Sequence, residues 1–331
     1  MSETLISVVT VTYNHEKFIE KCILSVVNQN VDFKIEMIIG EDCSTDKTKE
    51  IVQKYEKLYP DIIKPIYYKE NLGNSGRDNF VNLIKHCKGK YIAVLDGDDY
   101  WLPGKLKVQV AFMENHTDYS LSFHGVNKVY NMSESKDSFY EKEVASNLSL
   151  NHLIYSQNYI CNSSVMYRAD KFDIDLFDEL HPSPYVFGDW LCHIIALRNG
   201  DKMKFLDETL GMYRVHDKGM SNASISSERR AFINKSWLNI IESCYKLNIN
   251  SNVVSITEKR HYYNMFKQMK QMKQIGEKEK MLEYLKKSLS VYSPLGITRT
   301  ISNLNNSFIL KTVCSLSKEI DKLIFYTFYN K

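Results

Sequence analysis

The sequence predicts an α/β fold in which a mostly parallel sheet is flanked by helices. Short apolar runs alternate with amphipathic segments through the first hundred residues, and repeated β-α-β units of this kind build parallel sheets covered on both faces. Polar residues directly follow several of the expected strands, at the edge where such sheets bind ligands. After about Ser226 the pattern becomes mainly helical and rich in lysine. These three observations predict a catalytic or binding domain followed by a helical region.

Four strands are expected, because four runs are apolar or β-branched enough to be buried. They are Ile6–Thr12, Ile35–Gly40, Ile62–Tyr68 and Tyr91–Leu95. The apolar positions from Phe18 to Val27 recur at helical spacing. A second helix is expected to run to about Tyr59 with Ser44 as its cap, and a third spans Arg77–His86.

The middle of the chain is less regular. We expect a polar loop over Met132–Ala145, a strand over Cys161–Tyr167 and an amphipathic helix that opens at Asp189 and ends near Gly200. The domain boundaries that follow are 1–225 for the α/β domain and 226–331 for the helical region. Triplets such as Asn162-Ser163-Ser164 match the glycosylation pattern, but in a chain rich in Asn they are expected by chance.

The composition is that of a soluble globular protein. The chain has 331 residues, 44% hydrophobic and 25% charged, which is ordinary for a soluble globular protein. No apolar run approaches the roughly 18 residues that span a bilayer. Its seven cysteines are scattered without a CxxC pair, which favours reduced thiols in a cytoplasmic protein and argues against a zinc site.

Charge is spread unevenly along the chain. Residues 231–331 hold 16 Lys and Arg against 7 Asp and Glu, about +9, and the preceding 230 residues carry about −6. Three interpretations of the lysines between Lys267 and Lys287 stay open: a solvated helix face, an oligomer interface, or attachment to an anionic membrane helped by the aromatic run Leu323–Tyr329. The negative main domain argues against nucleic-acid binding.

The turn Asp96-Gly97-Asp98-Asp99, directly after the expected strand Tyr91–Leu95, is the most informative feature of the sequence. Three carboxylates this close repel one another unless a cation or a donor-rich ligand lies among them. Hard oxygen ligands suit Mg²⁺ or Mn²⁺, and Mg²⁺ is usually held by one or two carboxylates together with substrate phosphates. A solvated acidic turn is the alternative, but the position at the carboxyl end of a strand favours a site for a metal and a diphosphate.

Glycine-based phosphate sites are excluded. A dinucleotide-binding domain would show G-x-G-x-x-G after the first strand, where this chain has Tyr13-Asn14-His15-Glu16. The P-loop pattern G-x-x-x-x-G-K-[ST] is also absent. We therefore expect phosphate binding to depend on a metal and basic side chains.

Several motifs, in order, resemble glycosyltransferase family 2, the inverting sugar transferases with the GT-A fold. Any one of them is weak, but six in the expected order, over roughly residues 5 to 222, are strong. They are Val9–Asn14, Glu41–Thr48, Asn71-Leu72-Gly73 with Arg77-Asp78-Asn79, Asp96–Pro103, Gly188-Asp189-Trp190, and Tyr213–His216. Two departures appear: Asp78 stands where the family often has a small residue, and the acidic pair before Trp190 is reduced to Gly188-Asp189.

The resemblance implies a role for each candidate residue. Asp189 would be the general base, and Asp98 and His216 the metal ligands for Mn²⁺ or Mg²⁺. Asp42 would accept a hydrogen bond from the nucleobase, Asp96 would contact the ribose or the metal shell, and Arg214 would pair with a phosphate. The remaining residues expected at the nucleotide or donor sugar are Thr12, Tyr13, Asn14, Arg77 and Asp99.

A structural interpretation stands beside several of these roles. Asp42 and Asp189 could be helix caps, Arg77 an exposed residue at a helix start, and Asp99 a support of the turn. Trp190 could stack on an acceptor sugar, although a place in the core is more common for Trp.

The function that the resemblance implies is transfer of a hexosyl or N-acetylhexosaminyl group from a UDP-sugar. The acceptor would be a lipid-linked or surface glycan in bacterial polysaccharide assembly, at the inner face of the plasma membrane. A non-catalytic sugar-binding module would not need Asp98, Asp189 and His216 together. A nucleotidyltransferase would need a loop rich in glycine and in lysine or arginine after the first strand, which is absent.

Overall fold

The computed structural model describes residues 5–73, 76–130, 133–138, 148–156, 158–181, 188–216, 227–258 and 260–261. The chain divides near residue 225 into two units. In the described ranges, no helix combines the length and apolar character needed to cross a membrane.

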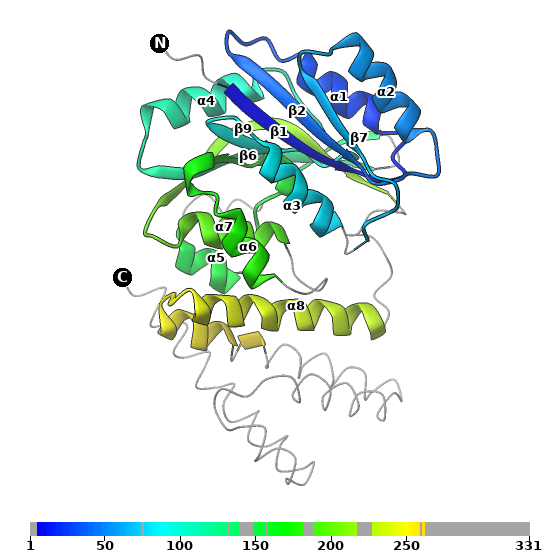
Figure 1. Ribbon diagram of the computed structural model, residues 1–331. Coiled ribbons are helices and arrows are strands. Elements are labelled where there is room, and N and C mark those ends of the chain that lie inside the picture. The colour runs from blue at the N-terminus through cyan, green and yellow to red at the C-terminus, as the bar shows by residue number, and fades with distance from the viewer. Residues whose placement is uncertain are drawn as a thin grey trace. The chain divides into compact units, whose positions relative to one another are not determined.

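The first unit is built on one mixed sheet (Figure 1). Its first half has the parallel order β3-β2-β1-β4, formed by β1 (Leu5–Thr12), β2 (Lys34–Glu41), β3 (Ile63–Tyr67) and β4 (Tyr91–Val94). These are the four predicted strands, each shifted by at most a residue or two. The α/β class and GT-A architecture expected from the sequence therefore describe this half well.

The second half of the sheet is mixed rather than parallel. The short strand β8 (Met166–Arg168) runs antiparallel to both β4 and β6 (Tyr119–Tyr130). Strand β9 (Lys202–Val215) pairs parallel with β6, while β5 (Tyr100–Trp101) and β7 (Ser133–Ser138) add antiparallel edges. The prediction of a strand over Cys161–Tyr167 is partly wrong, because residues Asn162–Ser164 form a 3-10 turn ahead of β8.

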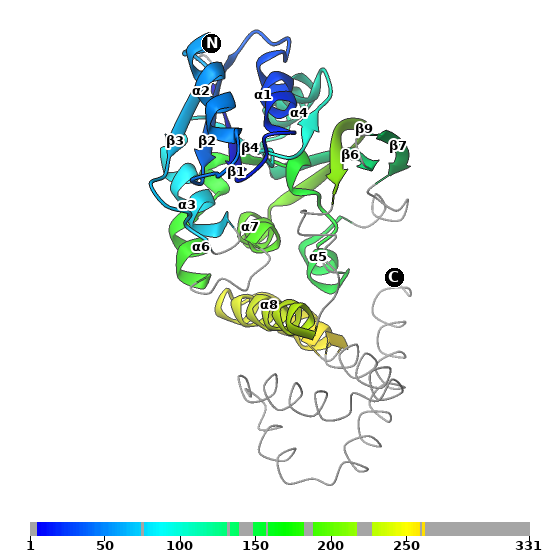
Figure 2. The same ribbon diagram turned by 90° about the vertical axis from the view of Figure 1, so that its right-hand side faces the viewer.

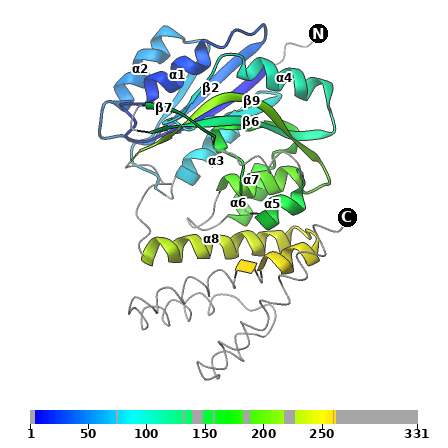
Figure 3. The same cartoon turned by 180° about the vertical axis from the view of Figure 1, so that it is seen from behind.

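Helices cover both faces of the sheet (Figures 1 and 3). One face carries α1 (Ile19–Val27), α2 (Thr48–Leu58) and α4 (Lys105–Asn115). Their buried residues pack with β1, β2 and β4 in one core cluster, which includes Ile6, Ile23, Met37, Ala93 and Leu106.

The other face carries α3 (Arg77–His86), α6 (Ile174–Leu180) and α7 (Gly188–Leu197), with α5 (Leu150–Ser156) beside α7 (Figure 2). The α3 bounds match the prediction. Trp190 on α7 is 1% exposed, so it lies in the core rather than at a surface where a sugar could stack on it.

The predicted cap of α2 is wrong. The helix begins at Thr48, whose backbone N–H and hydroxyl both donate to the Asp46 carboxylate. Ser44 instead uses its Oγ to accept from the backbone N–H of Asn14, 3.0 Å away. The hydroxyl therefore joins the loops after β1 and β2, a contact that a local capping rule does not anticipate.

The second unit contains α8 (Ser227–Lys246) and a further helix over 251–258. Tyr245 Oη donates to Glu258 Oε2 at 3.0 Å, and the rings of Trp237 and His261 stack with centroids 4.9 Å apart. A mainly helical region was predicted here. The lysines Lys267–Lys287 and the run Leu323–Tyr329, on which the membrane interpretation rests, lie outside the described residues.

Candidate active site

Sheet register brings the predicted polar residues to one edge. Thr12 pairs with Glu41 across β1 and β2, and Val9 pairs with Val94 across β1 and β4. The backbone N–H of Gly97 then donates to the Val11 carbonyl at 3.1 Å. The acidic turn after β4 therefore lies against the end of β1, as the carboxyl-edge rule predicts.

Gly97 is required by this close approach. A Cβ added to it would lie 2.8 Å from both the Cβ and the Oγ1 of Thr12 and 2.9 Å from Nδ1 of His15. Real Cβ atoms do not come so near, so the glycine of the acidic turn lets the carboxylates sit directly over β1.

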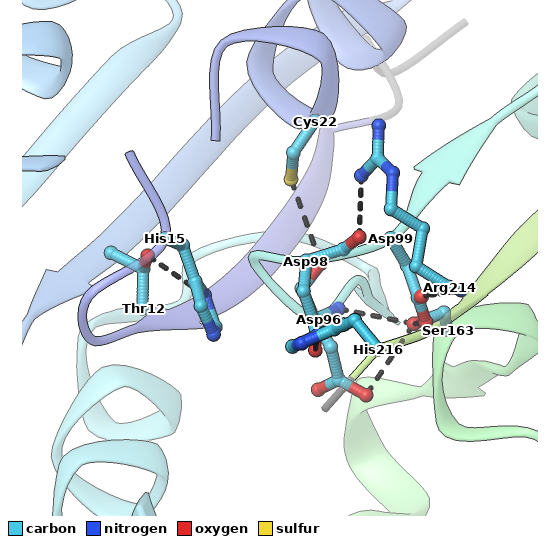
Figure 4. Close-up of polar contacts among 9 residues, drawn as sticks. All are labelled: Thr12, His15, Cys22, Asp96, Asp98, Asp99, Ser163, Arg214 and His216. Carbon is cyan, nitrogen blue, oxygen red and sulfur yellow. Dashed lines mark hydrogen bonds and ion pairs between the residues drawn. The ribbon is translucent and has the colours of Figure 1, made fainter. Parts of the chain in front are cut away.

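Strand β9 delivers the second part of the site from far along the chain. Tyr100 pairs with Met212, which places the end of β9 beside the acidic turn. His216 Nε2 then lies 3.1 Å from Asp98 Oδ2, and the Arg214 guanidinium donates to the Asp98 carbonyl (Figure 4). The predicted association of residues 98 and 216 is present in the structure.

Arg214 and His216 are held by aromatic neighbours. The Arg214 guanidinium carbon lies 4.6 Å from the Tyr100 ring centroid and 5.2 Å from that of Phe18, distances suited to cation–π contact. Phe18 also lies 4.6 Å from the His216 ring. Arg214 is 5% exposed, so its visible role is to join β9 to the turn, and pairing with a phosphate stays a prediction.

The three carboxyls of the turn have different environments. Burial and the charge of Asp98 raise the pKa of Asp96 to about 7. Burial, then Asp98 and Asp96, raise the pKa of Asp99 well above its ordinary value. Burial alone would raise the pKa of Asp98, but the hydrogen bond from His216 and the nearby rings of His15 and His216 outweigh it and lower that pKa. Asp98 is thus the carboxyl most readily ionised.

Asp99 faces inward. It is 1% exposed, its Oδ1 accepts from the Arg214 backbone N–H at 2.8 Å, and its Oδ2 accepts from Ser163 Oγ at 2.5 Å. These contacts support its interpretation as a residue that fixes the turn, while contact with a donor sugar stays a prediction.

His15 was not predicted as a site residue. Its Nδ1 lies 3.2 Å from Thr12 Oγ1, and its ring interacts electrostatically with Asp98, His216 and Arg214 (Figure 4). Burial is the largest influence on its pKa, which is lowered. In the sequence, the one feature that marks His15 as a possible site residue is its position in the loop after the first strand.

Asp42 directly follows β2 at the same edge and is 3% exposed. Its Oδ1 accepts from the Leu72 backbone N–H at 2.8 Å, and its Oδ2 accepts from Asn71 Nδ2 at 3.2 Å. The Asn71-Leu72-Gly73 motif therefore orients this carboxylate, and burial raises its pKa. No hydrogen bond links it to α2 in the described residues, so the interpretation as a helix cap is not supported.

The first loop is fixed by its neighbours. Asn14 adopts a φ of +55° and its Oδ1 accepts from the Thr45 backbone N–H at 2.8 Å. Thr12 is buried, whereas Tyr13 is 41% exposed. Of the three residues predicted to line the nucleotide pocket, Tyr13 has the most accessible side chain, and Asn14 has a structural partner.

Arg77 lies with α6 and not with the acidic turn. Its guanidinium donates to the carboxylates of Asp78 and Asp178, and its Nε lies 3.3 Å from Nδ1 of His181. Asp78, the departure from the family pattern, is therefore a partner of Arg77. A nucleotide contact for Arg77 stays a prediction.

Asp189 lies in the first turn of α7. Its Oδ1 accepts from the Trp190 backbone N–H at 2.8 Å and its Oδ2 from Asn158 Nδ2 at 2.7 Å. Burial raises its pKa to about 6 despite these bonds. Its charge also contributes to the raised pKa of Asp96.

The site offers a small set of side chains that could hold a divalent metal. Among the described residues, no three or more His, Cys, Asp or Glu side chains gather closely enough to hold a metal by themselves. Asp98 Oδ2 and His216 Nε2 converge as a pair, and Mg²⁺ commonly combines one or two protein ligands with substrate phosphates. The residues fit a metal shared with a diphosphate.

The fold and the site define an α/β protein that gathers carboxylates and an imidazole where strands end. A family model described as glycosyl transferase family 2 matches residues 7–173, half of the chain. The chain belongs to this family.

Two curated relatives share about 30% identity with most of this chain. An uncharacterised protein of Mycobacterium bovis is 30% identical over 225 residues, which cover 68% of this chain and 62% of that relative, so the chain spans about three fifths of its length. The putative teichuronic acid biosynthesis glycosyltransferase TuaG of Bacillus subtilis is 31% identical over 235 residues, 70% of this chain and 86% of TuaG.

A solved structure supports the fold. The crystal structure of S. aureus TarS 1-349 in complex with UDP-GlcNAc matches with a TM-score of 0.59 at 21% identity, covering 79% of this chain and 72% of that one. The predicted family and GT-A fold are therefore confirmed.

Proposed function

We propose that the protein is an inverting, metal-dependent glycosyltransferase that moves a sugar from a UDP-sugar to an acceptor hydroxyl. The observation that carries the proposal is the arrangement of Asp98, His216 and Asp189. A carboxylate and an imidazole converge at 3.1 Å, and a second, half-buried carboxylate on α7 interacts electrostatically with the same turn. The similarity to a TarS structure that contains UDP-GlcNAc supports a nucleotide-sugar donor.

The nucleotide end of the site would be recognised by Asp42. Uracil N3–H is a hydrogen-bond donor, and Asp42 presents a carboxylate already oriented by Asn71 and Leu72. Each carboxylate oxygen keeps a second lone pair after these bonds, so acceptance from a base is possible. UDP in place of another nucleotide rests on the resemblance and on the TarS structure, which contains UDP-GlcNAc.

The diphosphate would lie over the acidic turn, with Asp98 and His216 holding Mn²⁺ or Mg²⁺. When bound, such an ion neutralises charge that develops on a leaving diphosphate. Burial and the neighbouring carboxylates raise the pKa values of Asp96 and Asp99, and a cation bound at the turn would offset the repulsion among these groups.

Asp189 would serve as the general base. Inversion requires the acceptor oxygen to attack the anomeric carbon on the face opposite the departing UDP. The Asp189 carboxylate takes the hydroxyl proton as the new C–O bond forms, and the bonding electrons of the old bond leave with UDP. A pKa of about 6 keeps the carboxylate mostly ionised at neutral pH while making it a stronger base than an exposed Asp.

A donor screen tests the proposal. Purified full-length protein is incubated with UDP-, dTDP- and GDP-sugars in Mn²⁺, in Mg²⁺ or in EDTA, with and without candidate glycan acceptors, and nucleoside diphosphate release is measured. UDP release that needs a metal supports the proposal. Failure of every donor to react, together with measurable binding of a nucleotide sugar or glycan, would favour the non-catalytic binding module.

The acceptor and the cellular site are proposed more broadly. TuaG is named for teichuronic acid biosynthesis, and a lipid-linked or surface glycan suits this protein as well. We propose a cytoplasmic protein that contacts the inner face of the plasma membrane through its basic C-terminal region, or that forms a homo-oligomer there.

A further inference from the structure

Residues 158–164, between α5 and β8, donate hydrogen bonds to carboxylates from two separate elements. Asn162 Nδ2 donates to Asp96 Oδ1 at 2.9 Å, and Ser163 Oγ lies 2.5 Å from Asp99 Oδ2 in the acidic turn. Four residues earlier, Asn158 Nδ2 donates to Asp189 Oδ2 at 2.7 Å. One short segment thus contacts both the acidic turn and the carboxylate on α7.

Buried side chains of the core donate hydrogen bonds to the backbone of this segment. Trp101 Nε1 donates to the Ser163 carbonyl at 2.6 Å, and Gln109 Nε2 donates to the Ser164 carbonyl at 3.1 Å. Gln109 and Ser164 are fully buried, and Trp101 is nearly so. A segment anchored to the core in this way holds its outward-facing donors in constant positions.

Asn158 is oriented before it meets Asp189. Its Oδ1 accepts from the Ile160 backbone N–H at 3.0 Å, a local bond that sets the side-chain rotamer. The opposite end of the amide then points its N–H toward Asp189. Among the described residues, Asn158 is the one side chain that donates to this carboxylate, since the other donors are backbone N–H groups of Asp189 and Trp190.

We infer that residues 158–164 form a positioning segment that sets the Asp189 carboxylate relative to the acidic turn, with Asn158 orienting the base and Asn162 orienting Asp96. Neither Asn158 nor Asn162 was predicted from the sequence to belong to the site. This inference rests on the proposed function for its meaning in the reaction, but the contacts themselves do not.

The surroundings of Asp189 make the effect of Asn158 measurable. Four acids from the turn, the segment, β8 and α7 interact electrostatically with it: Asp96, Cys161, Tyr167 and Cys192. Burial raises the pKa of Asp189, and the bond from Asn158 opposes that rise. Loss of the Asn158 amide should therefore raise this pKa further.

The first experiment measures the Asp189 pKa directly by carboxyl ¹³C NMR on full-length protein labelled at Asp. Its resonance is identified by its absence in Asp189→Asn. In Asn158→Ala we expect the pKa to rise by about one unit, the size expected for a hydrogen bond to a charged group. The matched control is Asn115→Ala, which removes an exposed amide that donates only to the Ala111 carbonyl on α4. An Asp189 pKa that stays within 0.3 unit, roughly a quarter of the expected effect, would overturn the inference.

Kinetics separate the two ends of the segment. Asn158→Ala should lower kcat about fivefold near pH 6, move the acid limb of kcat upward, and leave UDP affinity unchanged. Asn162→Ala should weaken UDP binding in Mn²⁺ about tenfold and leave the acid limb in place. The same change in both variants would contradict the division of roles. If Asn158→Ala does not fold, Asn158→Asp keeps the size of the side chain, and the added charge should raise the Asp189 pKa further.

The NMR titration needs no turnover, so the two proposals can fail separately. A shifted Asp189 pKa in a protein that transfers no sugar would retain the positioning role and remove the glycosyltransferase. If the wild type transfers sugar but Asn158→Ala changes neither the Asp189 pKa nor the acid limb of kcat, the glycosyltransferase proposal stands and the positioning role is removed.

Discussion

Asp96→Asn should stabilise the metal-free protein at alkaline pH although it removes a residue of the proposed site. Burial and Asp98 raise the pKa of Asp96 from 3.8 to about 7. The folded state therefore holds this proton more tightly than the unfolded state, and the free energy of unfolding falls as pH rises from about 4 through 7.

The magnitude follows from the shift. A difference of about three pKa units corresponds to about 4 kcal/mol for a fully shielded carboxyl. Asp96 keeps partial exposure, and solvent screening reduces this cost to about 2 kcal/mol. Asparagine keeps the Oδ1 that accepts from Asn162 and carries no charge, so the gain should be largest above pH 7 and smaller at pH 5.

Urea unfolding in EDTA at pH 5, 6, 7 and 8 checks this. The free energy of unfolding of Asp96→Asn minus that of wild type should grow by about 1–2 kcal/mol from pH 5 to pH 8. Asp61→Asn, which changes an exposed carboxyl, should give a curve parallel to that of wild type. A difference for Asp96→Asn that is constant with pH, or that falls, would refute the electrostatic account of the acidic turn.

Three further predictions concern the turn, the metal and the C-terminal region. Gly97→Ala should cost about 1–3 kcal/mol of stability, because its Cβ would lie 2.8 Å from Thr12; Gly188→Ala, whose Cβ would meet ordinary contacts at 3.5 Å or more, should change the melting temperature little, and equal effects would argue against the close approach. Asp98→Asn should lower metal-dependent UDP release by about a hundredfold or more, and near-normal activity would remove Asp98 as a ligand. Full-length protein should co-sediment with anionic liposomes more than protein ending near residue 230, and equal pelleting would argue against membrane binding through the tail.

Local patterns predicted the first half of the sheet well. Strands β1, β2 and β4 are apolar and β-branched runs, so they carry a signal that depends on no distant residue. The acidic turn could likewise be placed, because its position at the end of β4 follows from the order of the strands. Ser44 shows where local rules fail, since its hydroxyl bonds to a loop thirty residues away.

The less predictable contacts of the site come from long-range packing. Asn162 and Ser163 meet the acidic turn across more than sixty residues, and in the sequence they form only a triplet of the glycosylation type. Strand β6 was also missed, because most of its residues are buried whichever face they point to, so it shows no clear alternation of polar and apolar positions. Family resemblance supplied Asp189 and His216, whereas the residues that orient them became visible only in the structure.

The central claim is that Asp189 acts on a nucleotide sugar bound at Asp98 and His216. The most direct measurement compares wild type and Asp189→Asn for UDP affinity in Mn²⁺ and for UDP release from the active donor in the presence of acceptor. The account predicts affinity within about threefold of wild type and release lowered by about a thousandfold. Release close to the wild-type rate, with affinity unchanged, would contradict it.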